Sequence, residues 1–581
     1  MVSCRDFLEP YPQGNRSGDD LWKYPEMANG LIGQAYDYIP TDYNNNEGAY
    51  LDCATDNAVS TSTTRDIRKL AVGTITPGQD PFISYYERDY QGIYLVNTFL
   101  KDNRGFKIRY LVNPELDSLV RHRLQGEAFA LRAWFHWDLL QKFGGKSVDG
   151  RLLGIPIVTE PVTMSETFDM ARNTYDDCVA QILKDCDSAY KHLPLAHRNF
   201  LVEDLATQQA YAGSRYFRRM EGIIARAIQA NVCLTWASPR FNPGNDNTRW
   251  EKAATYAKEV IDFKLNIDNV ANGFNPTTAI NWVNPNFPGA VWVSRYSKNS
   301  NMERMLYPGN FQGNGTMGAT QELVDAFPMA NGYPISDSRS LYDASNPYAG
   351  RDPRFYNTIF HNDAQAKKNN TAALMYTFET WNDGGKDAPE IRSDNSRTGY
   401  YIKKFIYMGL NFSDATVDIG YHSKFLIRWS HMCLVFAEAA NNDVGPLDNS
   451  KYGLSAKDAI AYLRLRKVVG NTGGISPDPY LDEISGTGKA AFNEFIKNER
   501  RIETCFEGMR FYDLRRWDVL LTDLNKPVHG IRITRPESGP LTYETVQVEN
   551  RSFPSPYMPI PYNEMLRMKS MVQNEGWDTW N

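Results

Sequence analysis

The chain lacks the long apolar run that a membrane-spanning helix needs. No stretch of about 18 consecutive apolar residues occurs in its 581 residues, so a transmembrane helix is excluded. Blocks of lysine or arginine are also missing, and the formal net charge is -6. Such a chain has no electrostatic footprint for nucleic acid or for an anionic membrane surface. These two classes of partner are therefore excluded.

Recognised catalytic and metal-binding motifs are absent as well. The sequence contains no phosphate-binding loop and no Ser/His/Asp signature. It has 7 cysteines, but none forms a CxxC or CxH spacing, so no zinc site is expected. Cys178 and Cys186 lie on one predicted helix, about 12 Å apart by helical rise, which is too far for a disulfide. We predict no metal and no cofactor, and cysteines that mostly fill the core.

The first residues contain a candidate lipidation site. MVSC ends in Cys4 and is followed by RDFLEPYPQG, a polar stretch with two prolines. This resembles the end of a bacterial lipoprotein signal, in which small or apolar residues precede the lipidated cysteine. The competing interpretation is an unmodified cysteine behind a cloning methionine. We expect residues 1–20 to be a lipoprotein tether that is anchored through Cys4.

Amphipathic helices are expected in two blocks. The stretch from Leu116 to Phe143 is apolar nearly all round and ends at Gly144, so it should be a buried helix. Successive helices of this kind resemble helical-hairpin repeats, although no strict repeat period of about 34 residues is present. The other predicted helices span residues 173–193, 219–236 and 250–263 in the first block, and 425–441 and 456–469 in the second.

The run NERRIETCFEGMRFYDLRRW, residues 498–517, is a charged segment with a helical pattern. Glu499 and Glu503 lie on its apolar face, where carboxylates are costly unless they are paired. Gly508 allows a left-handed turn, after which a second helix folds back and brings its arginines to the acids of the first. We predict a buried ion network formed by Glu499, Glu503, Glu507, Asp513, Arg500, Arg501, Arg510, Arg515 and Arg516.

A second interpretation takes Glu499 and Glu503 as the general acid and base of a glycosidase. Catalytic pairs usually project from opposite sides of a cleft. Residues four apart lie one above the other on one helix face. The structural network is therefore the favoured interpretation.

Residues 264–420 are expected to form loops with short extended segments such as AVWVSRY at 290–296. Their many aromatic residues exclude a disordered linker, and residues 36–90 have a similar composition. Exposed rings stack on the C–H face of a sugar, while carboxylates and amides bind its hydroxyls. The competing interpretation is that the rings anchor loops to the core and that the polar groups are solvated. The candidate ligand residues are Tyr85, Tyr86, Trp282, Tyr296, Tyr307, Phe311, Asp42, Asn44, Asp52, Asp56 and Arg65.

Several stretches resemble the SusD/RagB family of outer-membrane lipoproteins. The charged run resembles the family pattern NERR-x-E-x-x-x-EG-x-R-x-x-DL-x-RW. The stretches RLQGEAFALRAWFHWDLLQKFGG, ATQELVDAFPMANGYPI, RDPRF, AEAAN, PIPYNEM and QNEGW resemble further family segments in chain order. In the last, Glu575 stands where proline is common. The resemblance covers essentially the whole chain and implies that the charges of the run belong to the scaffold.

The resemblance implies a mostly α fold, with a tetratricopeptide-like scaffold of four helical hairpins and a loop-rich subdomain that contains short strands. It divides the chain into the tether (1–20), an N-terminal helical region with ligand loops (21–263), a loop-rich ligand-binding subdomain (264–420) and a C-terminal helical region (421–581).

The function implied is non-catalytic binding of oligosaccharides at the surface of a Gram-negative outer membrane. The protein would deliver them to a SusC-type TonB-dependent transporter and act as its lid, alongside other surface glycan-binding proteins and glycosidases. Two alternatives are a RagB-like peptide binder and a helical glycoside hydrolase. The aromatic-rich loops favour glycans over peptides, and no motif singles out the carboxylate pair of a hydrolase. Ring stacking suits starch, fructan, xyloglucan and host glycans alike.

Overall fold

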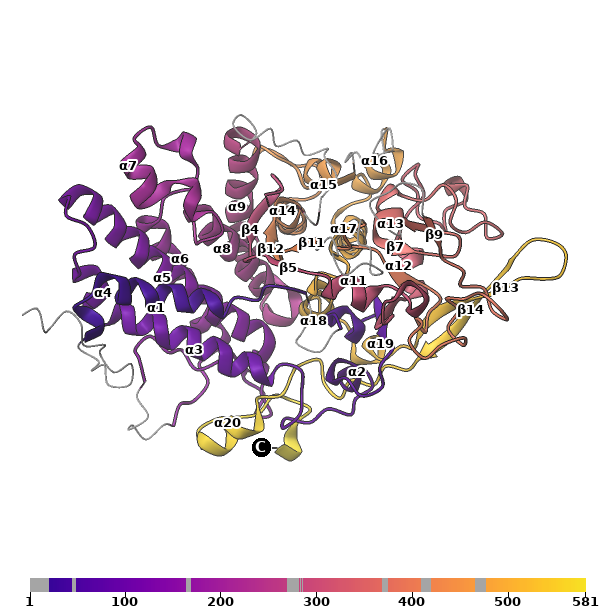
Figure 1. The fold of residues 1–581 in the computed structure, drawn as a ribbon, viewed down its shortest axis with the longest axis horizontal. Coiled ribbons are helices and arrows are strands. Elements are labelled where there is room, and N and C mark those ends of the chain that lie inside the picture. The colour runs from indigo at the N-terminus through magenta and orange to yellow at the C-terminus, as the bar shows by residue number, and fades with distance from the viewer. Residues whose placement is uncertain are drawn as a thin grey trace, which may run out of the picture.

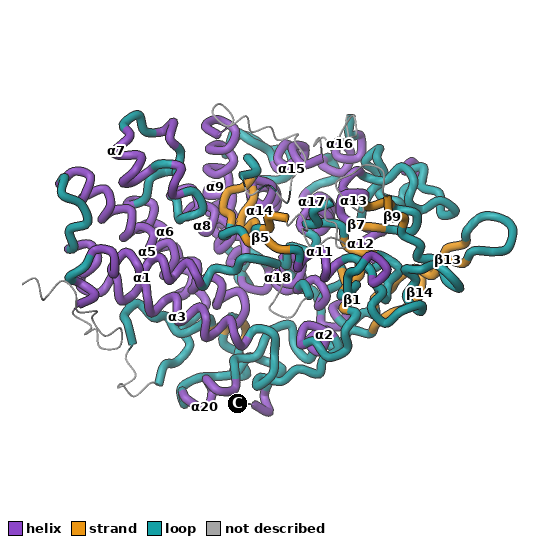
Figure 2. The backbone as a smooth tube through the Cα atoms, in the orientation of Figure 1, coloured by secondary structure: helices purple, strands orange, loops and turns teal. Residues whose placement is uncertain are grey.

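The computed structural model describes residues 20–43, 49–162, 169–268, 282, 284, 286–367, 375–408, 420–464 and 477–580. Cys4 and Asn44 lie outside these residues. Helices dominate the described chain, and its strands are short (Figures 1 and 2). No helix in these ranges has both the length and the apolar character needed to cross a membrane.

The first helical block agrees with the sequence pattern. Helix α5 (Pro114–Phe143) begins after Asn113, whose side chain accepts hydrogen bonds from two backbone N–H groups of the first turn. Helix α6 (Tyr175–His192) begins after Thr174, whose hydroxyl accepts from the backbone N–H of Asp177. The two following helices lie within a few residues of their predicted positions. They are α8 (Gly222–Ala237) and α9 (Asn247–Asp262).

The helices of this block pack mainly against their neighbours in the chain. Helix α6 packs on α5, α8 on α6 and α9 on α8, while α3 (Ile83–Leu100) covers α5 and α1 (Pro25–Asp37) covers α3. Helix α14 (Trp429–Asp443) continues the series against α9, and Figure 1 shows the passage from the first block to the second. Stacked helical hairpins and a mostly α fold are therefore confirmed.

The second block is built around α14, which is buried from Trp429 to Asn441. Both α15 (Ala456–Arg464) and α17 (Lys489–Thr504) pack on it. The predicted helix over 425–441 is wrong at its start, because Phe425–Arg428 forms strand β12 and pairs with β4 (Ala290–Val293). Bulky and β-branched side chains suit such a buried strand better than a helix start. Residues 465–469 of the other predicted helix lie outside the described residues.

The remaining helices of this block are short. They are α16 (Pro479–Ser485) and α18 (Met509–Arg516). The short helices elsewhere are α2 (Asp66–Ala71), α4 (Arg104–Lys107), α7 (Leu205–Thr207), α11 (Asn301–Leu306), α12 (Gln321–Ala326), α13 (Pro353–Thr358), α19 (Leu521–Leu524) and α20 (Tyr562–Arg567).

The strands of the described residues form two-stranded antiparallel ladders, some between distant parts of the chain and others within local hairpins. Besides β4–β12, the ladders that join distant segments pair β1 (Ala58–Ser60) with β6 (Met317–Ala319), β5 (Ser297–Asn299) with β11 (Gly420–His422), and β7 (Ile359–Phe360) with β10 (Tyr401–Ile402). The local hairpins pair β2 (Gly145–Lys146) with β3 (Leu152–Leu153), β8 (Gln365–Lys367) with β9 (Met375–Thr377), and β13 (Val528–Thr534) with β14 (Thr542–Glu549). Figure 1 shows the last hairpin projecting from the body. The loop-rich segment is thus tied to both helical blocks.

The described cysteines are small core residues without disulfides, as the sequence predicted. The buried free thiols are those of Cys53, Cys178, Cys186, Cys233, Cys433 and Cys505.

Candidate functional site

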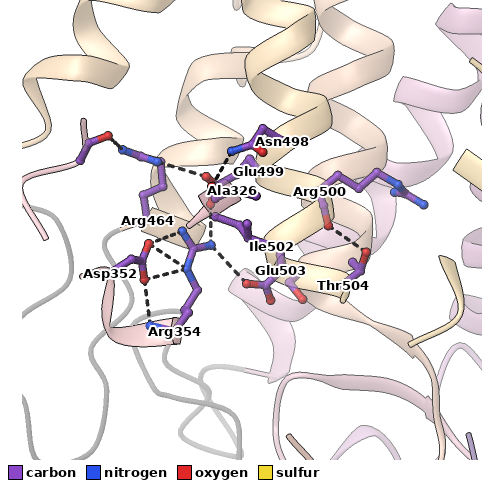
Figure 3. A network of polar contacts seen from close by, with 12 residues as sticks. Ala326, Asp352, Arg354, Arg464, Asn498, Glu499, Arg500, Ile502, Glu503 and Thr504 are labelled. Atoms are coloured by element: carbon purple, nitrogen blue, oxygen red, sulfur yellow. Dashed lines mark hydrogen bonds and ion pairs between the residues drawn. The ribbon is translucent and has the colours of Figure 1, made fainter. Parts of the chain in front are cut away.

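The acids of helix α17 are ion-paired and buried. Glu499 binds Arg354 and Arg464, with oxygen–nitrogen distances of 2.5 and 3.1 Å (Figure 3). Glu503 binds Arg428 at 3.1 Å and Arg354 at 3.5 Å. Because each carboxylate is surrounded by guanidinium groups and has almost no exposed surface, neither occupies a cleft position suited to a glycosidase acid or base.

The turn between α17 and α18 extends this network. Glu507 accepts from Arg428 at 2.6 Å, from Lys404 at 2.8 Å and from His431 at 2.9 Å. Burial alone would raise the pKa of Glu507, but Arg428 and Lys404 hold it well below its usual range. Gly508 has a φ of 81°, the left-handed conformation that the sequence predicted. The charges therefore fix the position of this turn.

The pairing pattern differs from the prediction in three ways. Of the α18 arginines, Arg510 binds Asp56 at 2.8 Å and Arg516 binds Glu438 at 2.6 Å, so neither reaches the acids of α17. The ion pair between the two helices has its arginine on α17 and its acid on α18, the reverse of the prediction: Arg500 binds Asp513 at 2.7 Å. Arg515 does not join the network, because its guanidinium is turned onto the ring of Phe511. Asp56 and Glu438 come from segments more than 50 residues away, and local helix geometry cannot indicate them.

Four of the predicted ligand rings are in the core. Tyr85 and Tyr86 on α3 are 7% and 5% exposed, and Tyr307 and Phe311 are 1% and 6% exposed. Neighbouring side chains pack against these rings: Phe311 stacks on Tyr376 with centroids 4.6 Å apart, and the guanidinium of Arg88 lies 4.3 Å from the Tyr85 centroid. The expectation of exposed rings is therefore wrong for these four. In the described conformation they anchor helices and loops.

Trp282 is half-buried. Its ring lies edge-on to Phe405 and Phe425, with centroid distances of 4.7 and 5.5 Å. The side chains of Lys404 and Arg428 approach the same ring at 4.8 and 5.0 Å. Trp282 thus covers part of the buried ion network.

The polar candidates divide into structural and accessible groups. Asp52 is fully buried and accepts hydrogen bonds from the backbone N–H groups of Phe506 and Gly508, at 2.8 and 3.0 Å. Asp56 is bound by the guanidinium groups of Arg501 and Arg510. These two aspartates hold the turn between α17 and α18 in place and are unsuited to bind sugar hydroxyls. Asp42 is exposed and Arg65 is half-buried, while Asn44 lies outside the described residues.

Tyr296 is the predicted ring that reaches solvent. It is 50% exposed and lies next to Tyr421, which is 45% exposed, with ring centroids 5.2 Å apart and planes at 73°. Tyr296 precedes β5 and Tyr421 lies on β11, where it pairs with Lys298. We call Arg218, Tyr296, Lys298 and Tyr421 the tyrosine surface.

Two cations border these rings. The guanidinium of Arg218 lies 4.8 Å from the Tyr296 centroid, and the ammonium of Lys298 lies 5.5 Å from that of Tyr421. The backbone at Arg218 is held in a left-handed conformation, with φ 80°, and its carbonyl oxygen accepts from the Trp292 indole at 3.2 Å. The Nε of Arg218 has no acceptor among the described residues. The surface thus offers two exposed rings beside two cationic side chains, a combination that suits a sugar.

A buried histidine–glutamate contact supports the strand that carries Tyr421. His422, the next residue, contacts Glu303 with a nitrogen–oxygen distance of 3.1 Å, and both side chains are buried. Glu303 also accepts from the backbone N–H of Tyr407 at 2.8 Å. Sequence alone did not indicate Arg218, Lys298 or Tyr421. Tyr421 reaches Tyr296 through a strand pairing across more than 100 residues, and Arg218 reaches it from a loop in the first helical block.

Comparison with known proteins identifies the family. A family model described as "SusD family" matches residues 264–577, more than half of the chain. The chain belongs to the SusD family. A second SusD-like model, described as "Starch-binding associating with outer membrane", matches residues 6–215. The SusD family is a carbohydrate-binding family associated with the outer membrane.

Individual SusD-like proteins resemble the chain over nearly its full length. SusD-like protein P38 of Formosa agariphila is 22% identical over 545 residues, covering 91% of each chain. A solved SusD-like protein of Bacteroides fragilis has a TM-score of 0.71 at 23% identity and covers 96% of this chain and 98% of its own. A laminarin-binding SusD-like protein has a TM-score of 0.55 at 18% identity and covers 95% of this chain and 99% of its own. At these identities the solved structures establish the SusD-like fold.

Proposed function

We propose that this SusD-like protein binds oligosaccharides without cleaving them, and that the tyrosine surface is its ligand site. The observation that carries this proposal is the exposed pair Tyr296 and Tyr421, bordered by Arg218 and Lys298, in a chain of a carbohydrate-binding family. The rings supply stacking faces, and the cations donate hydrogen bonds to hydroxyl groups.

The protein delivers its ligand to a SusC-type TonB-dependent transporter and closes that transporter as a lid. It is held at the outer-membrane surface by a lipid on Cys4. The family membership and the printed association with the outer membrane support this part of the proposal. A lid encloses its cargo only if the tyrosine surface faces the transporter cavity. In a purified complex, cross-linking from residue 298 should therefore reach the transporter, and an outward-facing surface would refute the lid.

The test of ligand class is a binding panel on the purified protein. Affinity electrophoresis against laminarin, starch, fructan, xyloglucan and host glycans should show retardation by at least one polysaccharide, without release of reducing sugar. Tyr421→Ala should reduce that retardation. A panel of peptides provides the competing outcome, because tight peptide binding with no glycan binding would identify a RagB-like peptide receptor.

A further inference from the structure

A second candidate site is a cavity of about 370 Å³ that is separate from the tyrosine surface. It opens where α18, α19 and β13 approach the turn that precedes β1. Its walls are largely apolar and include Leu514, Val519, Leu524, Val528 and Phe553. None of the four residues of the tyrosine surface lines it. A volume of this size is within the range of small-molecule pockets and exceeds what a single bound ion fills.

Arg515 is a cation on this cavity without a counter-charge. Its side chain is 7% exposed, and no carboxylate oxygen of the described residues lies within ion-pair distance of it. It donates one hydrogen bond, from Nη1 to the carbonyl oxygen of Phe511, and its Nε has no acceptor among the described residues. The guanidinium is stacked on Phe511 at 3.4 Å and faces Phe553 at 5.1 Å. Burial and the nearby Arg240 lower the pKa of Arg515 to about 9.

A second guanidinium on the cavity has only a shared counter-charge. Arg551 is 4% exposed, and it binds Glu549 together with Arg68 and Arg397. Three guanidinium groups thus share one carboxylate. The Nε of Arg551 also has no acceptor among the described residues. This end of the cavity therefore has an excess of positive charge.

The carboxylates that line the cavity are already paired. Asp56 is bound by arginines, Glu322 binds His529, and Asp523 binds Lys526 at 2.7 Å. The charges of Asp56 and Asp523 are therefore compensated, and Glu322 keeps free lone pairs as acceptors for hydroxyl groups. The uncompensated positive charge at the cavity is that of Arg515, together with the partly compensated Arg551.

We propose that this cavity binds a carboxylate-bearing sugar residue, a hexuronate, with its carboxylate on Arg515. The planar guanidinium matches a carboxylate better than it matches a spherical ion, and the apolar walls accommodate the C–H face of a sugar ring. The lone pairs of Glu322 accept from the sugar hydroxyls. This site is independent of the tyrosine surface.

The test measures binding of D-glucuronate and D-galacturonate to the full chain by thermal shift and calorimetry at constant ionic strength. D-Glucose, acetate and sulfate are the comparison ligands. At least one uronate should raise the unfolding temperature of the wild type more than any comparison ligand does. Arg515→Met should weaken uronate binding by at least about tenfold. Arg515→Lys keeps the charge but loses the planar fork, and it should also bind more weakly.

Lys526→Met provides the matched control, because it removes a positive charge from the cavity rim and leaves Arg515 in place. It should change uronate affinity by less than about twofold. Tyr296→Ala should leave uronate binding intact, which separates this site from the proposed glycan site. The inference is overturned if the wild type binds no uronate, if both Arg515 variants bind it normally, or if acetate and sulfate bind as well as the uronates do.

Discussion

Glu507→Ala should destabilise the protein strongly. Its carboxylate is the shared partner of Arg428, Lys404 and His431, and all four side chains are buried. Alanine would leave a guanidinium and an ammonium group in the core without this counter-charge. Breaking a buried ion pair by removing one partner costs about 3 to 5 kcal/mol of unfolding free energy. We expect a loss at the upper end of that range because two permanent cations lose the same partner.

The neighbouring acid provides a graded comparison. Glu503→Ala should cost less, because Arg428 keeps Glu507 and Arg354 keeps Glu499. Glu544→Ala is the matched control, since its pair with Arg532 is solvent-exposed, with side-chain exposures of 66% and 52%. An exposed pair contributes about 0 to 1 kcal/mol.

Urea unfolding followed by tryptophan fluorescence and far-ultraviolet circular dichroism measures all three variants. The midpoint should fall most for Glu507→Ala, less for Glu503→Ala and least for Glu544→Ala. Equal midpoints for Glu507→Ala and Glu544→Ala would refute the scaffold role. A Glu503→Ala variant with the wild-type midpoint that had lost hydrolysis of a polysaccharide would instead support the glycosidase interpretation.

Three further predictions concern pH, the turn and the anchor. Burial lowers the pKa values of His136, His361 and His431 to about 4. The unfolded chain binds protons first, so the unfolding free energy should fall between about pH 6.5 and 4, by up to about 1.4 kcal/mol per pH unit for each histidine. His136→Gln should flatten that dependence in urea titrations, and an unchanged slope would contradict it. Gly508→Ala should lower the unfolding free energy by about 1 to 2 kcal/mol in the same assay, because a φ of 81° is unfavourable for alanine. The added Cβ itself has room, since its nearest neighbour is Leu51 at 3.8 Å. An unchanged unfolding free energy would contradict the left-handed turn. Cys4→Ala in the native gene should release the protein from outer-membrane fractions, and retention after high-salt washing without the transporter would exclude Cys4 as the anchor.

The sequence predicted the helical part of the fold well, since apolar periodicity and end signals are local. Asn113 and Thr174 cap the helices that follow them. Gly144 follows the end of α5, and Gly508 forms the left-handed turn between α17 and α18, as the sequence predicted. The strand at Phe425 was missed because its partner, β4, lies more than 100 residues away. Local pattern cannot show a ladder of that separation.

The candidate site was less predictable, because composition does not reveal exposure. Tyr85 and Tyr296 both lie in segments rich in polar and aromatic residues. The Tyr85 ring, on α3, is nevertheless buried, whereas the Tyr296 ring is half exposed. The same limit applies to Asp52. Its polar loop sequence suggests an exposed side chain, but its carboxylate is buried and binds the backbone N–H groups of Phe506 and Gly508 in the turn between α17 and α18. Which rings and charges meet is decided by tertiary packing.

The most direct test of the proposed function is calorimetry of Tyr296→Ala and Tyr421→Ala with the oligosaccharide that binds best in the glycan panel. Tyr94→Ala on α3 is the matched control, because Tyr94 is 47% exposed and lies outside the tyrosine surface. Loss of one stacking ring is worth about 1 to 3 kcal/mol by analogy with aromatic platforms for nucleotides, so affinity should fall roughly five- to 150-fold in each surface variant. Affinity should remain at the wild-type value in Tyr94→Ala, and unfolding midpoints should stay nearly unchanged in all three. Wild-type affinity in both surface variants would contradict the assignment of this surface as the glycan site.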